Sequence, residues 1–305
     1  MIAGGAGRSA ANRGRSKLSA PARAGLLFVL PALVYIVLTQ LLPVIYALYV
    51  SFTDYSPLNR GAPRWVGLQN YRAMIFSREF QNALWVTVRF SAAVIVLNVV
   101  ISLGLALLLE GASRALRWLQ VVLFLPIVTS VAAVSVVWLL LYDRDFGLLN
   151  QILNAFGLSN VGWLNTVAWA LPSLVIMRVW RGAGWNTVIY RAALQGVPRE
   201  VIEAAKVDGA SALQLFRQIL LPLLRPITAY IVIVGLISTL QTFAEIYILT
   251  SGGPLGSTTT VGFLIYRQAF EYGQLGLACA TSFVLFVVIF ALSFGSFALA
   301  RKGMT

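Results

Sequence analysis

Long apolar segments alternate with short polar ones along this chain. A helix needs roughly 20 apolar residues to cross a membrane. Six segments are that long, at about residues 24–52, 83–109, 118–141, 167–193, 227–250 and 277–299. Their apolar runs are continuous rather than alternating, which favours helices over a membrane β-barrel. The pattern therefore predicts an all-α integral membrane protein with six transmembrane helices.

Composition supports this class and excludes others. The chain has 305 residues, of which 59% are hydrophobic and only 11% charged, whereas about a quarter of a soluble domain is charged. It contains no histidine, which removes the commonest metal ligand and general base. Of its ten acidic residues only Glu245 lies in the middle of a predicted span. A membrane-embedded enzyme and a metal site are therefore disfavoured.

The basic residues predict the orientation in the membrane. Residues 1–23, rich in Gly, Ala, Ser and Arg, are expected to form a disordered basic tail, and the apolar run that follows is too long for a secretory signal peptide. If the N-terminus is cytoplasmic, fourteen Lys and Arg residues fall in cytoplasmic segments and six in external loops. We therefore expect both termini, and the loop at about 194–226, to be cytoplasmic.

That loop contains the stretch EAAKVDGASALQLFRQILLPLLRP. Pro198 can open a short helix, because its missing N–H would have no partner in the first turn. Asp208 and Gly209 form a stop signal, with Gly209 free to adopt the left-handed conformation. Ser211 and Gln214 have the spacing of a capping box and predict a second helix. The sequence thus predicts a short helix, a tight bend and a second helix between spans four and five.

The first of these helices is expected to present a shallow surface. Val201, Ala204 and Ala205 share one face at helical spacing, and the two alanines would permit close approach of a groove on another protein. An amphipathic hairpin lying on the membrane surface is the alternative interpretation of the same pattern.

The residues in this loop also carry a resemblance. The segment closely resembles the EAA loop of permeases in binding-protein-dependent ABC importers. The residues at the family's spacing are Glu203, Ala204, Ala205, Asp208, Gly209, Ala210, Ile219 and Pro222. Further stretches, among them YILTSGGPLGSTTT, are similar to the carbohydrate-uptake branch, of maltose or glycerol-3-phosphate type. The resemblance covers nearly the whole chain after the tail.

The resemblance implies a six-helix permease domain over 24–305 in a bacterial cytoplasmic membrane, with the EAA loop as a coupling helix seated on an ATPase. It implies a second homologous permease, two copies of the ATPase and an extracytoplasmic solute-binding protein, and no nucleic acid. The chain carries no G-x-x-x-x-G-K-[ST] loop. ATP and Mg are therefore expected on the partner ATPase, and this chain is expected to be a transport subunit rather than an enzyme, with no cofactor of its own.

Polar and aromatic side chains within the spans are candidates for the substrate path, because they are costly in lipid. They are Asn98, Trp138, Arg178, Trp180, Arg181, Gln241, Glu245 and Tyr247. Gln241 and Glu245 are four residues apart and would share a helix face. For Arg178 and Arg181 an ion pair with Glu245 is favoured over direct contact with the solute. Packing is the alternative for Trp180.

The solute and the external contacts stay open at this point. A neutral sugar is favoured, and glycerol 3-phosphate or a glycerophosphodiester is the alternative. Gly252, Gly253 and Pro254, with the loop at 53–82, are candidates for docking the binding protein, against the alternative of a simple solvated turn. A secondary transporter is the more distant rival, but it would have no reason to carry the EAA loop.

Overall fold

The computed structural model describes residues 20–59, 61–110 and 114–302. Most of the predicted basic tail, residues 1–19, lies outside the described residues. Within them every regular element is a helix, and the β-type pairing is an isolated bridge between Thr53 and Trp65. The all-α prediction is confirmed.

The chain divides into two compact units, Met1–Tyr49 and Val50–Thr305. The first contains α1 (Ala20–Ile36), η1 (Val37–Leu41) and α2 (Leu42–Ser51) up to Tyr49. η1 is a π-helical turn just before Pro43, which has no N–H to continue the α-helical ladder. The N–H of Leu42 bonds to the carbonyl of Val37 instead. These helices fall in the first predicted span.

The second unit is built around two long helices, α4 (Arg78–Leu109) and α8 (Val167–Gln195). The other elements are α3 (Gln69–Phe76), α5 (Arg114–Val128), α6 (Val131–Leu141), α7 (Leu148–Ala155), α9 (Arg199–Val207), α10 (Ala212–Gln214), η2 (Leu215–Leu220), α11 (Leu221–Leu223), α12 (Arg225–Leu240), α13 (Ala244–Leu249), α14 (Val261–Tyr266), η3 (Arg267–Glu271) and α15 (Leu275–Lys302).

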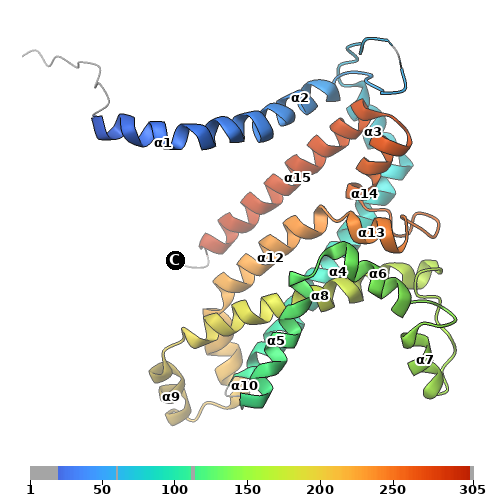
Figure 1. Cartoon of the computed structure of the whole chain (residues 1–305). Helices are drawn as coiled ribbons and strands as arrows, with labels where there is room; N and C mark the ends of the chain where they lie inside the picture. Colours follow the sequence, from blue (N-terminus) through green and yellow to red (C-terminus); the bar gives the residue numbers. More distant parts are fainter. Residues whose placement is uncertain (1–19, 60, 111–113, 303–305) are drawn as a thin grey trace, which may run out of the picture. The chain divides into compact units, whose positions relative to one another are not determined.

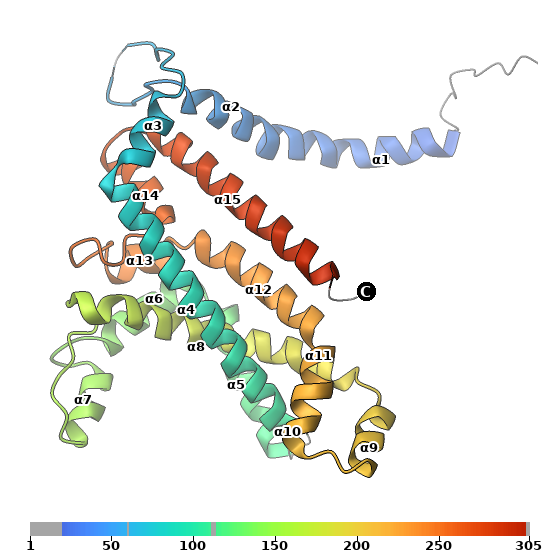
Figure 2. The same ribbon diagram turned by 180° about the vertical axis from the view of Figure 1, so that it is seen from behind.

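α4 is the central helix of this unit. It packs along α8 and against α12, and α12 packs on α15 (Figures 1 and 2). Its buried face follows helical spacing through Ala83, Val86, Phe90 and Val94. Figures 1 and 2 show α9 and α10 at one end of this bundle, and α3 with the start of α15 at the other.

Helices meet through small residues where their backbones touch. A Cβ on Gly184 of α8 would lie 1.8 Å from the carbonyl oxygen of Leu123 in α5. Close backbone approach of this kind is how helices associate in lipid, where apolar side chains gain little by leaving the tails. α5 and α8 therefore form a tight pair next to the α4–α8 contact.

Two of the six predicted spans are not single straight helices. The span predicted at 118–141 bends by 110° between Val128 and Val131, shortly after Pro126 has removed one ladder hydrogen bond. The span predicted at 227–250 breaks after Leu240, and its remainder continues as α13. The apolar runs by themselves do not reveal these breaks.

By length and composition, three of the described helical segments can cross a membrane, or up to five if each bent pair counts as one span. The 29-residue α8 is not among them, and it carries Arg178 and Arg181 near its middle. The count of six spans therefore stays a prediction.

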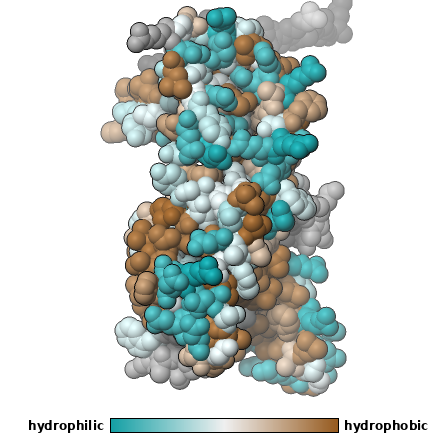
Figure 3. Space-filling model, turned by 90° about the vertical axis from the view of Figure 1, so that its right-hand side faces the viewer, coloured by the Kyte–Doolittle hydropathy of each residue, from teal (hydrophilic) through white to brown (hydrophobic). Residues whose placement is uncertain are grey.

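Large apolar side chains remain on the surface of the second unit. Phe146 and Phe156, on either side of α7, are 83% and 80% exposed. Figure 3 shows apolar patches beside polar areas on one face of the molecule. Extended apolar surface of this kind is expected where lipid or another subunit covers a protein.

Candidate functional site

The loop after α8 folds as its local sequence predicts. Pro198 precedes α9, Glu200 lies in the first turn and Lys206 in the last, which matches the helix dipole at both ends. α9 ends at Val207, and Gly209, two residues further on, has a left-handed φ of +81°. The N–H of Ala210 bonds to the carbonyl of Ala205 at 2.9 Å and closes the bend.

The second helix starts with the predicted capping box. The Gln214 N–H donates to the Ser211 hydroxyl at 3.4 Å, and the Ser211 N–H donates to the Gln214 side-chain oxygen at 2.8 Å. Both donors would otherwise be free at the start of α10. α9 contacts η2 within the continuous run α10–η2–α11, so the two short helices form one braced element.

The exposed surface of this element differs from the prediction at one alanine. Glu203 and Ala204 are exposed, together with Asp208 and Gly209. Ala205 is only 9% exposed, because it faces into its own chain. The shallow surface on α9 is therefore formed by Ala204 and its neighbours rather than by both alanines. Ala210, Ile219 and Pro222 are partly buried.

A second region of interest is a cavity of about 270 Å³ between α4, α5, α8 and α12. Its polar lining residues are Asn98, Arg178, Arg181, Asn186, Ser238 and Thr239. Trp185 contributes an aromatic surface to the same wall. Three of the predicted substrate-path residues, Asn98, Arg178 and Arg181, are thus brought together.

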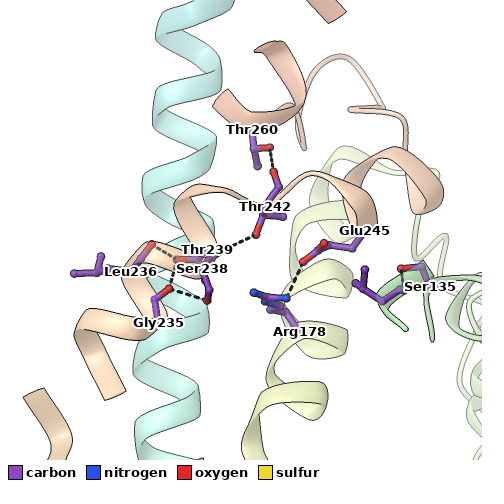
Figure 4. Close-up of polar contacts among 10 residues, drawn as sticks. Ser135, Arg178, Gly235, Leu236, Ser238, Thr239, Thr242, Glu245 and Thr260 are labelled. Atoms are coloured by element: carbon purple, nitrogen blue, oxygen red, sulfur yellow. Dashed lines mark hydrogen bonds and ion pairs between the residues drawn. The ribbon is translucent and has the colours of Figure 1, made fainter. Parts of the chain in front are cut away.

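Arg178 forms the predicted ion pair with Glu245. Nη1 of Arg178 lies 3.2 Å from Oε1 of Glu245, whose side chain is 5% exposed (Figure 4). That oxygen accepts no hydrogen bond of good geometry, so the contact is chiefly electrostatic. Glu245 opens α13 and does not line the cavity, and the pair ties α13 to α8.

The amides of the cavity come from two facing helices. Nδ2 of Asn186 lies 3.5 Å from Oδ1 of Asn98 across the α4–α8 contact. A Cβ on Gly182 would lie 3.0 Å from the same Oδ1, so this glycine makes room for the Asn98 side chain. The sequence pattern did not single out Asn186 or Ser238. The signal for Asn186 was present, since Arg178, Gly182 and Asn186 follow at i, i+4 and i+8 on one face.

Gln241 and Glu245 do not share a helix face, contrary to the prediction, because α12 ends at Leu240 and α13 begins only at Ala244. The carbonyl of Thr242, freed at the break, accepts a hydrogen bond of 3.0 Å from the Thr260 hydroxyl (Figure 4). A Cβ on Gly262 would lie 2.7 Å from that carbonyl oxygen, so only glycine allows α14 to approach so closely. Gln241 is exposed and does not line the cavity.

Trp138, Trp180 and Tyr247 lie outside the cavity lining. Trp138 is 8% exposed and packs with Tyr142 and Trp180, at ring-centroid distances of 5.1 and 5.4 Å. Tyr247 lies in a cluster with Phe243 and Tyr266. Trp138 is thus packed within the chain, whereas Trp180 and Tyr247 remain 44% and 45% exposed.

The loop with Gly252, Gly253 and Pro254 is fixed by a run of threonines. The Thr258 and Thr259 hydroxyls donate to the carbonyls of Gly253 and Gly252, at 2.7 and 3.0 Å. A Cβ on Gly252 would lie 2.6 Å from the Thr259 hydroxyl oxygen, so this position requires glycine. The loop is thus a rigid projection, and its tip, Leu255, is 95% exposed.

Residues 112–302 match the family of binding-protein-dependent transport system inner membrane components. The chain belongs to this family. This permease is 34% identical, over 88% of its length and 90% of the relative's, to the trehalose/maltose transport system permease protein MalF of Thermococcus litoralis. It is 33% identical, with the same coverage, to the sn-glycerol-3-phosphate transport system permease protein UgpA of Escherichia coli.

The permease also shares its fold with a solved transporter. It superposes with a TM-score of 0.80 on a chain of a bacterial ABC transporter involved in the import of the acidic polysaccharide alginate. The two sequences are 23% identical, and the match covers 92% of this chain and 96% of the other. The resemblance stated from the sequence motifs is confirmed at the level of family and fold.

Proposed function

We propose that this chain is a permease subunit of an ATP-driven importer, which moves a sugar or sugar-like solute by alternating access. A second homologous permease completes the path, and two copies of an ABC ATPase bind ATP and Mg. A solute-binding protein delivers the solute from outside. Both termini and the α9–α10 element face the cytoplasm in this proposal, as the distribution of basic residues predicts.

The braced α9–Gly209–α10 element is the observation that carries the proposal. It joins α8 and α12, two of the helices that enclose the polar cavity, and it exposes Glu203 and Ala204 on a short rigid helix. A force applied to this element therefore acts on two cavity walls. Asp208, Ala210, Ile219 and Pro222 would serve the coupling by holding the bend and the re-entry into α12.

Relatives support the class of solute. One is named for trehalose and maltose and another for sn-glycerol 3-phosphate. Sugar-like solutes are therefore our first proposal, and a glycerol phosphate compound is the alternative. For docking of the binding protein we propose the rigid loop at Gly252, Gly253 and Pro254 together with residues 53–82, where a cavity of about 510 Å³ opens between Thr53–Asn59 and the start of α15.

The coupling role is tested at Gly209. Nothing lies within 4 Å of a Cβ at this position, so a substitution there acts through the backbone alone. Valine is strained in the left-handed region by about 1–2 kcal/mol, whereas asparagine tolerates it. We expect Gly209→Val to reduce ATP-driven uptake in the reconstituted complex and Gly209→Asn to retain most of it. Equal uptake by Gly209→Val and the wild type would refute the coupling role.

Contact with the ATPase is tested by cross-linking from single cysteines, with Cys279 replaced by serine. Ala204→Cys is expected to capture the ATPase subunit, because this residue is exposed. Ala205→Cys is the matched control, since the adjacent side chain is buried in its own chain. Failure of Ala204→Cys to capture a nucleotide-hydrolysing subunit would contradict the proposed seat.

A further inference from the structure

The polar cavity carries one positive charge in excess. Arg178 and Arg181 both line it, and Glu245 is the carboxylate that lies beside them. The other acidic residues are not part of the cavity lining: Asp54, Glu79, Glu110, Asp143, Asp145, Glu200, Glu203, Asp208 and Glu271. Glu245 therefore balances one of the two arginines.

The arginine that Glu245 balances is Arg178, at 3.2 Å. Arg181, one turn further along α8, forms no ion pair with any residue that the structure describes. Its Nε is shielded from solvent, and none of the described residues accepts a hydrogen bond from it. A buried donor without a partner costs free energy, and a charged one costs more. Arg181 is thus a partly exposed cation that lines an open space and whose Nε has no partner.

The other polar groups of the cavity suit a polyhydroxylated molecule. Asn98 and Asn186 offer amide donors and acceptors from opposite walls, and their mutual contact of 3.5 Å is long enough to leave both available. Trp185 supplies an apolar face on the α8 wall. The volume of about 270 Å³ is at the small end for ligand sites and fits one sugar-sized unit.

We propose that Arg181 binds the carboxylate or phosphate of a sugar-sized anionic solute, whose hydroxyl groups bond to Asn98 and Asn186. This inference rests on the proposed function and narrows its solute class. The negative charge of the solute satisfies Arg181 during passage, as Glu245 satisfies Arg178 permanently. The Arg178–Glu245 pair is then a neutral structural element, and Arg181 determines the charge preference.

The test measures equilibrium binding to the purified complex without its binding protein, so that only the permease selects. Saturation-transfer NMR titrations compare glucuronate with glucose, and glycerol 3-phosphate with glycerol. Because a charge-assisted hydrogen bond is lost with the neutral probe, we expect the anion to bind about 10- to 100-fold more tightly in at least one pair. The pair that shows the larger ratio tells carboxylate from phosphate.

Three variants test which arginine produces the preference for the anionic probe. Arg181→Gln is expected to reduce the anion-to-neutral ratio to about one, and Arg181→Lys to retain a preference. The double variant Arg178→Gln/Glu245→Gln keeps the net charge and should keep the preference, whatever its absolute affinity. An equal affinity for anion and neutral probe in the wild type, an unchanged ratio in Arg181→Gln, or no saturable binding of any probe would overturn the inference.

These outcomes are separable from failure of the proposed function. ATP-driven uptake with the binding protein present tests the importer itself, and its absence would refute the importer whatever the binding ratio. Normal uptake together with an anion-to-neutral binding ratio of one would support the importer and refute the proposal of an anionic solute. A loss of complex assembly in Arg181→Gln, with no preference in the wild type, would assign Arg181 to a contact with the second permease instead.

Discussion

Gly184→Ala should separate two helices that now touch through their backbones. A Cβ at this position would lie 1.8 Å from the carbonyl oxygen of Leu123, and 3.1 Å from the Phe124 nitrogen. Both atoms belong to the backbone of α5, so no side chain can rotate away. To reach 3.4 Å, where ordinary contact begins, α5 has to move by about 1.6 Å (3.4 minus 1.8).

The size of the effect follows from two opposing terms. Overpacking costs about 1–3 kcal/mol, and the upper end applies because the clash is with backbone. Alanine in a helix gains about 0.5–1 kcal/mol over glycine. The net destabilisation is therefore about 2 kcal/mol. At about 2–4 °C per kcal/mol for a large domain, the unfolding midpoint should fall by about 4–8 °C.

The chain provides its own control and its own reporter. Gly104 lies inside α4 with nothing within 4 Å of a Cβ, so Gly104→Ala should keep the propensity gain without the clash and raise the midpoint. Cys279, the chain's single cysteine, is partly buried in α15, so a thiol-reactive fluorophore reports unfolding in detergent. All variants are heated at one rate, since the midpoint depends on it. A Gly184→Ala midpoint at or above that of the wild type would refute the backbone contact.

Three further predictions follow from single groups. Arg178→Gln or Glu245→Gln alone should cost about 3–5 kcal/mol by leaving a buried charge unpaired, and the double variant less than their sum in the same assay; additive costs would contradict the ion pair. Asn150→Ala removes the acceptor of the Trp163 indole N–H and should speed hydrogen exchange at residues 143–163, which mass spectrometry detects; unchanged protection would contradict this. The backbone N–H groups of Phe146 and Asp145 lower the pKa of Asp143 below its usual 3.8. The stability it adds is thus present above that value and lost as pH falls through the lower folded pKa, as an NMR titration of the carboxyl group checks.

Features set by neighbouring residues could be predicted from the sequence. The bend at Gly209 and the capping box of Ser211 and Gln214 are made of contacts within a few residues, so their pattern is sufficient. The Arg178–Glu245 pair was also predicted, because a buried arginine needs a carboxylate and Glu245 alone lies mid-span.

Features that depend on residues far apart in the sequence could not be predicted from it. The break after Leu240 is held by the Thr260 hydroxyl and by Gly262, about twenty residues further along the chain. Ala205 is buried by its own chain, which helical spacing alone does not show. The cavity forms only where α4, α8 and α12 come together. The sequence alone therefore does not show which residues line it, or that Trp138 and Tyr247 do not.

The contacts at the break also join the cavity to the external loop. Thr239 lines the cavity, and three residues later the carbonyl of Thr242 is bonded to Thr260. Thr260 ends the same threonine run that fixes the carbonyls of Gly252 and Gly253. If the rigid loop at Gly252–Pro254 moved, Thr260 would have to move with it. The Thr242 carbonyl would then either follow Thr260 or lose its buried hydrogen bond, at a cost of about 1–3 kcal/mol. Docking at this loop, as we propose for the binding protein, would thus act directly on the end of α12, where Ser238 and Thr239 line the cavity.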